Sequence, residues 1–495
     1  MEKVADMNVY LVMLLSAMMA FTMVNWVYFK ILKIAKDKNL VDNPDARKLQ
    51  KKPVPVLGGI AVFFGVIFGV LVAFSLAGVL PDVMFRTSLL PILAAMMVMI
   101  YVGAIDDILS LGPRSRLLIE VFAVVALVAS SGGCVDTLHG LWGVEGISLW
   151  LAVPLTVVAG VGIVNAINMI DGVNGLSSGL CMMCSVLFGF VFVRSGDWSN
   201  AVLAFVMAAS LLPFYVHNVF GDRSRMFIGD AGTMAVGMLL TWFVMEMLRS
   251  DNTTGHWADG SGAGLVAMVL AFLSVPVADT LRVMTMRMAH GKSPFAPDKN
   301  HLHHVFIAAG ISHVVTSTII IGINLLITLV WVLSVGFGLG AEAQFYVVVG
   351  VSMLLVWGTF AFVRYNERRH TDFMCRLSYY SNRTHWEHKE WWKAFSRWLD
   401  APDGYVEAKD GWEAEARSSV RKNVVDMENY KQADRKKVIE FLKDKAGVSV
   451  ENIIENSGAE KLRIYPILFE FEQEGIIEVI RRQSLGAPDI VRLKE

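Results

Sequence analysis

The chain has 495 residues, of which 55% are hydrophobic and only 18% are charged, and its mean hydropathy is +0.51. This composition is typical of a protein that spans a membrane many times and not of a water-soluble domain. The net charge of −1 gives no sign of a nucleic-acid partner. Two of the four cysteines, Cys181 and Cys184, have a CxxC spacing inside an apolar run, which favours packing over zinc or disulfide chemistry.

Apolar runs of about 20 residues recur from the amino terminus to Val363, and each is long enough to cross ~30 Å of hydrocarbon as a helix. We therefore expect an all-α polytopic membrane domain over residues 1–363. The first run lacks a basic region before it, which indicates a spanning anchor and not a cleaved signal. The eleven expected transmembrane helices are centred on 9–29, 56–79, 88–105, 117–131, 147–166, 176–193, 200–220, 231–248, 262–281, 314–336 and 344–363.

The basic residues predict the orientation of these helices. With the amino terminus outside, sixteen Lys and Arg residues before Arg364 lie on the inner side and four on the outer side. Such an excess marks the cytoplasmic face, so the carboxy terminus is expected in the cytoplasm.

Four polar clusters interrupt the apolar runs: AIDDILS (104–110), NAINMIDGVNG (165–175), FIGDAGT (227–233) and PDKNHLHH (297–304). In the expected topology all four lie on the cytoplasmic side. An Asp at the centre of a membrane helix costs roughly 2.5–3.5 kcal/mol, so clusters of this kind usually serve a function. Together they predict one site at one membrane face.

The acidic residues of these clusters suggest a divalent ion. Asp106 and Asp107 are adjacent, and two carboxylates in a low-dielectric mouth need a cation or a shared proton. Asp230 lies between Gly229 and Gly232, where backbone N–H groups can approach a phosphate. Mg²⁺ suits such a site, because it binds one or two carboxylates together with phosphate oxygens. Acidic caps at helix ends are the alternative for these residues.

Amides and imidazoles supply the other candidate ligands. Asn165, Asn168 and Asp171 recur on one helix face before a glycine turn, which favours a polar ligand over simple interhelical hydrogen bonding. His301, His303 and His304 suggest zinc by composition alone. Binding of a phosphorylated ligand is the stronger interpretation, because four cations lie nearby: Arg282, Arg287, Lys292 and Lys299.

Beyond residue 363 the composition changes, since residues 364–495 contain 24 basic and 24 acidic side chains. We expect a juxtamembrane segment and linker over 364–430. Its segment 383–399 carries Trp391, Phe395, Trp398 and Leu399 with helical spacing, which predicts a helix in the membrane interface or packed on the tail domain. Residues 431–495 show the order helix, short helix, helix and β-hairpin with a turn near SLGAPD, as in a small α+β winged-helix-like domain. Its balanced charge favours a protein partner over nucleic acid.

Taken together, the motifs resemble those of the polyprenyl-phosphate N-acetylhexosamine-1-phosphate transferases. The matching pieces are RKLQKKPVPVLGGI (47–60), AIDDILS, NAINMIDGVNGLSSG (165–179), FIGDAGTMAVG (227–237) and GKSPFAPDKNHLHH (291–304). They occur in family order within residues 8–363, and the tail lies outside the resemblance. The PDKNHLHH form is similar to the WecA/TagO-like branch, which is related to MraY. Family members often have DGxDG where this chain has Asn174, so the resemblance implies nucleotide hydrogen bonding there.

The resemblance implies an enzyme of the bacterial inner membrane with a cytoplasmic site. It would transfer N-acetylglucosamine 1-phosphate, or a related N-acetylhexosamine 1-phosphate, from its UDP-sugar to undecaprenyl phosphate, and so begin cell-envelope polysaccharide synthesis such as O-antigen. Implied roles are catalysis and Mg²⁺ binding (Mn²⁺ as the alternative ion) for Asp106, Asp107 and Asp230. Substrate binding is implied for Lys51, Asn165, Asn168, Asp171, Asn174, Asn218, Arg287, His301, His303 and His304. A homodimer is compatible with this interpretation.

Two other classes of protein also place polar residues in membrane helices. A transporter usually carries them near the midplane on broken helices of repeated halves, whereas here they lie at one face and no internal repeat is found. A membrane metallohydrolase needs a closed set of zinc ligands with one open position.

Overall fold

The computed structural model describes residues 2–42, 53–77, 89–109, 111–250, 264–294, 300–369, 389–400 and, with short gaps, 432–494. Lys51, the linker 401–429 and the predicted hairpin turn SLGAPD lie outside the described residues. The chain forms two compact units, residues 1–42 with 47–408 and residues 43–46 with 409–495. The predicted domain boundaries after residues 363 and 430 stay predictions.

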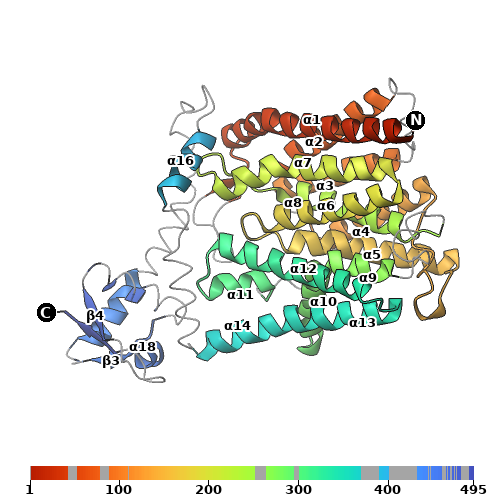
Figure 1. Cartoon of the computed structure of the whole chain (residues 1–495). Helices are drawn as coiled ribbons and strands as arrows, with labels where there is room; N and C mark the ends of the chain where they lie inside the picture. Colours follow the sequence, from red (N-terminus) through yellow and green to blue (C-terminus); the bar gives the residue numbers. More distant parts are fainter. Residues whose placement is uncertain are drawn as a thin grey trace. The chain divides into compact units, whose positions relative to one another are not determined.

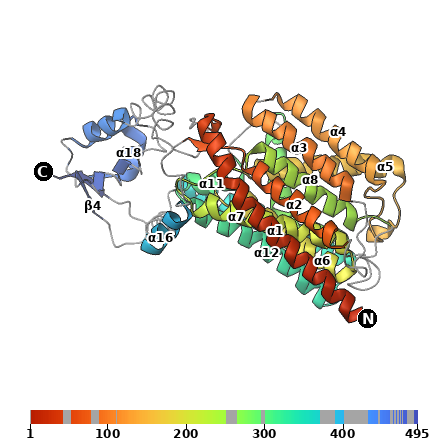
Figure 2. The same ribbon diagram turned by 90° about the horizontal axis from the view of Figure 1, so that it is seen from above.

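The first unit is a bundle of long helices that run side by side (Figures 1 and 2). The last of them continues from α13 through the π-helical turn η3 into α14. The helices of the bundle are α1 Glu2–Asp37, α2 Gly58–Ala77, α3 Leu89–Leu109, α4 Pro113–Ser131, α5 Leu149–Met169, α6 Leu176–Ser195, α7 Trp198–Phe220, α8 Gly229–Met247, α9 Leu265–Phe272, α10 Ser274–Ala289, α12 His313–Gly336, α13 Ala341–Ser352, η3 Met353–Trp357 and α14 Gly358–Arg369.

Each of the eleven predicted apolar runs contains a helix, which confirms a mostly helical, polytopic membrane domain. Among the described residues eight helices are long and apolar enough to span a membrane alone, or nine spans if α9 and α10, bent by 77°, count as one. α4 and α8 are not among the eight. α8 is buried within the bundle along almost its whole length, so its side chains meet protein and need no lipid-facing surface. The count of eleven therefore stays a prediction.

α8 packs against α2, α3 and α5 at the centre of the bundle. Glycines allow the closest of these contacts. A Cβ atom on Gly59 would overlap the backbone of Gly232, and a Cβ atom on Gly103 would overlap the backbone of Ala231. The backbone N–H groups of Gly58 and Gly59 donate to the carbonyls of Phe227 (2.9 Å) and Ile228 (2.8 Å). These contacts fix the start of α8 against the start of α2 and the end of α3.

Short elements lie between the long helices. The strands β1 Val41–Asp42 and β2 Val54–Pro55 pair antiparallel, and the 3₁₀ turn η1 Leu141–Gly143 precedes α5. α11 Leu302–Ala308 follows α10 after a loop and carries His303 and His304.

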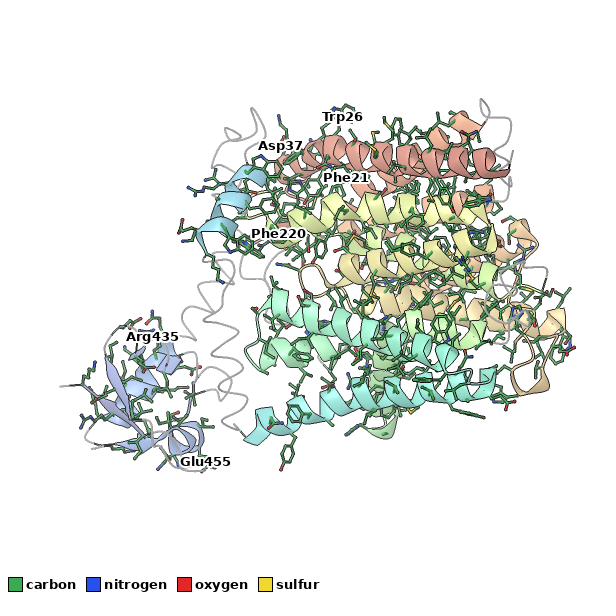
Figure 3. The ribbon with its side chains drawn as sticks, in the orientation of Figure 1. Phe21, Trp26, Asp37, Phe220, Arg435 and Glu455 are labelled. Carbon is green, nitrogen blue, oxygen red and sulfur yellow. The ribbon has the colours of Figure 1, made fainter. Side chains whose placement is uncertain are left out.

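The predicted aromatic helix of the tail is present as α16 Glu390–Leu399, and it belongs to the first unit. It packs on the end of α7, at the end of the bundle where Asp37 and Phe220 are labelled (Figure 3). Its buried face centres on Trp392 and Leu399, whereas Trp391 and Trp398 of the predicted stripe are 49% and 71% exposed. α16 therefore packs on the bundle, and its place in the membrane interface stays a prediction.

The second unit has its own small core. Residues 432–442 are helical, and they are followed by β3 Val448–Ser449, α18 Val450–Asn456, β4 Ile477–Ile480 and β5 Ile490–Leu493. The strands form an antiparallel sheet in the order β3-β5-β4. The buried core includes Val438, Leu442, Ile453, Phe471 and Val491.

The glycine contact between α2 and α8 gives a stability prediction. Gly59→Ala places a methyl group where the backbone of Gly232 lies, so we expect a loss of about 1–3 kcal/mol, as for other overpacked cores. Gly162→Ala is the control, because a Cβ atom there meets no atom within 4 Å. Thermal unfolding of both variants in detergent measures the effect. Equal unfolding temperatures for the two variants would contradict the predicted helix contact.

Candidate functional site

The predicted polar clusters lie on helix ends that meet at one end of the bundle. Asp106 and Asp107 are in the last turn of α3, Asn165 and Asn168 are near the end of α5, and Asp230 is in the first turn of α8. The loops that follow α5 and precede α11 lie at the same end. The sequence expectation of one shared site is therefore consistent with the packing.

Asp107 holds the start of α8. Its carboxylate accepts hydrogen bonds from the backbone N–H groups of Asp230 (2.9 Å) and Ala231 (3.3 Å). An N-terminal helix end favours a negative charge, so Asp107 of α3 caps α8. Gly229 has φ +72°, and a Cβ atom there would lie 2.5 Å from Asp107 Oδ2. The capping alternative considered for Asp230 thus applies to Asp107 instead.

Asp106 and Asp230 face one cation. Arg116 Nη1 on α4 lies 3.3 Å from Asp106 Oδ2 and 3.4 Å from Asp230 Oδ2. The remaining oxygens also have donors, because Asp106 Oδ1 accepts from Leu111 N (2.6 Å) and Asp230 Oδ1 accepts from Asn168 Nδ2 (2.5 Å). Two carboxylates from different helices therefore converge on a single positive group.

Glu120 is a site residue that the sequence analysis missed. Its side chain is fully buried, accepts a hydrogen bond from Arg116 Nε (3.1 Å), and accepts another from Asn165 Nδ2. Glu120 orients Arg116 toward the two aspartates. The available signal was the Arg116–Glu120 spacing of four residues, with an acidic residue inside an apolar run.

The loop between α5 and α6 lies at the same end of the bundle and carries two further predicted site residues. Asp171 accepts from Ser177 Oγ (2.5 Å), and the backbone N–H of Asn174 donates to His313 Nδ1 (3.4 Å). Asn218 is buried at the end of α7, where its Oδ1 accepts from Gly175 N (2.7 Å). Burial, with the charge of Asp230 adding to it against the Ser177 hydrogen bond, raises the pKa of Asp171 to about 6.

A buried aspartate positions the histidine segment. Asp279 of α10 lies 3.0 Å from His301 Nδ1 and 2.6 Å from Arg282 Nη2, and it accepts from Leu302 N. Arg282 and His301 were predicted from the sequence, but Asp279 was not. Its signal was the spacing of three residues between Asp279 and Arg282.

The histidines form a stack that reaches the α5–α6 loop. The ring of His303 lies 6.0 Å from that of His301 and 4.2 Å from that of His304, measured between centroids. A Cβ atom on Gly172 would lie 2.6 Å from His303 Nε2, so only glycine fits there. Burial, and then the charges of His304 and His301, hold the pKa of His303 well below its usual range, so this imidazole is neutral.

Arg287, in the last turn of α10, contacts the segment that follows its own helix, because its Nη1 donates to the carbonyl of Pro294 (2.6 Å). In the part of the chain that the structure describes, no group of three or more His, Cys, Asp or Glu side chains converges as a metal cluster. The pair Asp106 and Asp230 nevertheless fits a hard divalent cation, since both present carboxylate oxygens to one positive centre. Asp107 fits this role less well, because backbone N–H groups engage both of its oxygens.

Comparison with known proteins identifies the family of the chain. The model of the family described as "Glycosyl transferase family 4" matches residues 89–248, which span α3 to α8. The undecaprenyl-phosphate α-N-acetylglucosaminyl 1-phosphate transferase of Salmonella typhi is 30% identical over 334 residues, 66% of this chain and 83% of that protein. The proteins of the same name from Yersinia pestis and Escherichia coli K12 are 27% and 29% identical, over 57% and 56% of this chain and 73% and 72% of their own length. The chain belongs to the family of polyprenyl-phosphate N-acetylhexosamine-1-phosphate transferases.

Proposed function

We propose that this enzyme transfers N-acetylglucosamine 1-phosphate from UDP-N-acetylglucosamine to undecaprenyl phosphate and releases UMP. The names of the relatives support both substrates. The observation that carries the proposal is the convergence of Asp106 and Asp230 on Arg116, at the end of the bundle where the α5–α6 loop meets the histidine stack. The product would be the first lipid-linked sugar of a cell-envelope polysaccharide, such as lipopolysaccharide O-antigen.

The reaction exchanges one phosphoanhydride partner for another. An oxygen of the lipid phosphate attacks the sugar-bearing phosphorus of the donor and forms a new P–O bond. The bond from that phosphorus to the bridging oxygen breaks, and the oxygen leaves with UMP. Little proton transfer is needed, because a phosphate monoester has a second pKa near ~6. Positioning and charge neutralisation therefore supply most of the catalysis.

The chain offers groups for each of these tasks. Asp230 and Asp106 would hold Mg²⁺ or Mn²⁺, and the bound ion would neutralise the donor diphosphate. Asn168 keeps the Asp230 carboxylate in place through a hydrogen bond. Arg116 pairs with the carboxylates and could instead pair with a phosphate of the substrate. His303 lies beside the α5–α6 loop and His301 lies in the same stack, and their ring N–H groups would donate hydrogen bonds to phosphate or sugar oxygens. Asn165, Asp171, Asn174 and Asn218 would line the nucleotide.

The orientation follows from the charge asymmetry. We infer an enzyme of the bacterial inner membrane with its amino terminus outside and its site in the cytoplasm, where UDP-sugars occur. The excess of basic residues on that side supports this orientation. A transporter fits less well, because the polar side chains gather at one end of the helices.

We also propose that the second unit is a winged-helix-like domain that binds a protein partner in the cytoplasm. Its antiparallel sheet in the order β3-β5-β4, next to a helix at 432–442 and α18, supports this fold. The balance of 24 basic and 24 acidic side chains over residues 364–495 argues against nucleic acid.

Transfer can be tested directly with purified protein, radiolabelled UDP-N-acetylglucosamine and undecaprenyl phosphate. We expect labelled lipid diphosphate and an equal amount of UMP. Asp230→Asn keeps the shape of the side chain but removes its charge, so kcat should fall a thousandfold or more, about 4 kcal/mol in barrier. Asp197→Asn at the start of α7 is the control, because Asn also caps a helix and this position lies at the opposite end of the bundle. Absence of the lipid product with wild-type protein would rule out the proposed function.

The raised pKa of Asp171 predicts a dependence of stability on pH. Folding favours the protonated carboxyl, so the stability that this group contributes is present below pH ~4 and is lost as pH rises through about 6. Asp171→Asn removes the charge and should raise the unfolding temperature at pH 7.5, with a smaller gain at pH 5. Thermal unfolding of substrate-free protein at both pH values measures this difference. An equal shift at the two pH values would contradict the assignment.

A further inference from the structure

The tail contributes a carboxylate that lies at the start of the loop leading to Asp230. Asp400 directly follows α16, and it lies outside residues 89–248, the part that matches the family model. Its Oδ2 accepts from the backbone N–H groups of Asp222 (3.2 Å) and Arg223 (3.1 Å). Its Oδ1 accepts from Ser224 N (2.9 Å) and Ser224 Oγ (2.7 Å). Successive N–H groups that point at one carboxylate form an anion-binding nest.

Aromatic packing holds this carboxylate in place. The ring of Phe220, the last residue of α7, lies 4.4 Å from Trp392 and 5.3 Å from Phe395 of α16, measured between centroids. Trp392 and Leu399 are only 5% and 7% exposed. α16 is therefore anchored on α7 on one side of the loop, and Asp400 binds the loop itself.

The α7–α8 loop, residues 221–228, connects this anchor to the site. Ser224 O accepts from Tyr28 of α1 (2.8 Å), and Met226 O accepts from Asn218 Nδ2 (2.9 Å). The same Asn218 accepts from Gly175 of the α5–α6 loop. The loop then donates from Phe227 N to Pro55 O (2.8 Å) and accepts from Gly58 and Gly59 before it reaches Gly229 and Asp230.

We propose that Asp400 is a positioning residue for the transfer reaction, which holds the α7–α8 loop so that Asn218 and Asp230 keep their places. The inference rests on the proposed function. Three backbone N–H groups and a hydroxyl that lose their acceptor must find water or shift. The same loop accepts a hydrogen bond from Asn218, which contacts the α5–α6 loop, and it leads directly to Asp230. α16 and Asp400, which follow the membrane helices in the sequence, would thereby position the loop that precedes Asp230.

The test compares the wild-type enzyme with three substitution variants and one truncated chain. Asp400→Asn and Asp400→Ala remove the charge or the side chain. Glu390→Gln is the matched control, since it removes a carboxylate from the same helix whose side chain is 82% exposed and pairs only locally with Lys393. A chain that ends after Pro402 keeps α16 and Asp400 but removes the linker and the second unit.

The first measurement is hydrogen exchange of a peptide that covers residues 221–229, followed by mass spectrometry. Exchange should be at least tenfold faster in both Asp400 variants, and it should equal wild type in Glu390→Gln and in the chain ending after Pro402. Unchanged exchange in the Asp400 variants would overturn the proposal, whatever the activity of the enzyme.

The second measurement is the steady-state kinetics of transfer at matched amounts of folded protein. For Asp400→Ala we expect kcat/KM for UDP-N-acetylglucosamine to fall about tenfold, with a higher donor KM and an unchanged KM for undecaprenyl phosphate. A purely structural role would lower the active fraction and leave both KM values unchanged. Faster exchange without a kinetic change would show an anchor only and overturn the positioning role. If wild-type enzyme transfers no sugar phosphate, the proposed function fails, and the exchange result alone decides whether Asp400 holds the loop.

Discussion

The contact between the end of α3 and the start of α8 determines the geometry of the site. Asp107 caps α8 through two backbone N–H groups, and Gly103 and Gly229 let the two backbones approach closely enough for this bond. The same contact brings the carboxylates of Asp106 and Asp230 together, which is electrostatically unfavourable in a poorly solvated mouth. Arg116, held by Glu120, offsets this repulsion.

The arrangement separates support from chemistry. Asp107, Glu120 and Asp279 are engaged with backbone or with neighbouring side chains, and they fix helix ends and functional groups. Asp106 and Asp230, which share Arg116, and the histidine stack are the groups that we propose contact phosphate and metal. Each of these three carboxylates contacts a residue of another helix. The geometry of the site therefore depends on the packing of the whole bundle and not on one sequence motif.

The sequence predicted the parts of the site that depend on local spacing. Charged and amide residues next to apolar runs indicated the polar clusters, and the basic residues indicated that these clusters share one face. The role of Asp107 was not predictable in this way, because its partners Asp230 and Ala231 lie on another helix. Glu120 and Asp279 had a local signal in their pairs with Arg116 and Arg282, but their contacts with Asn165 and His301 cross to other elements. The same reason applies to Asp400, whose partners Asp222–Ser224 are remote in sequence. The helix of residues 383–399 was predicted, but its buried face was not, because Trp residues occur on several of its sides.

The central claim is that Asp106 and Asp230 form one anionic site for a divalent ion. Binding of Mn²⁺ to the purified, nucleotide-free protein, followed by the loss of the free-ion electron paramagnetic resonance signal, tests it most directly. The account predicts one ion per chain for wild type, with affinity at least tenfold weaker in both Asp106→Asn and Asp230→Asn, about 1.4 kcal/mol or more. Mn²⁺ binding that is equally tight in wild type and in Asp230→Asn would contradict it.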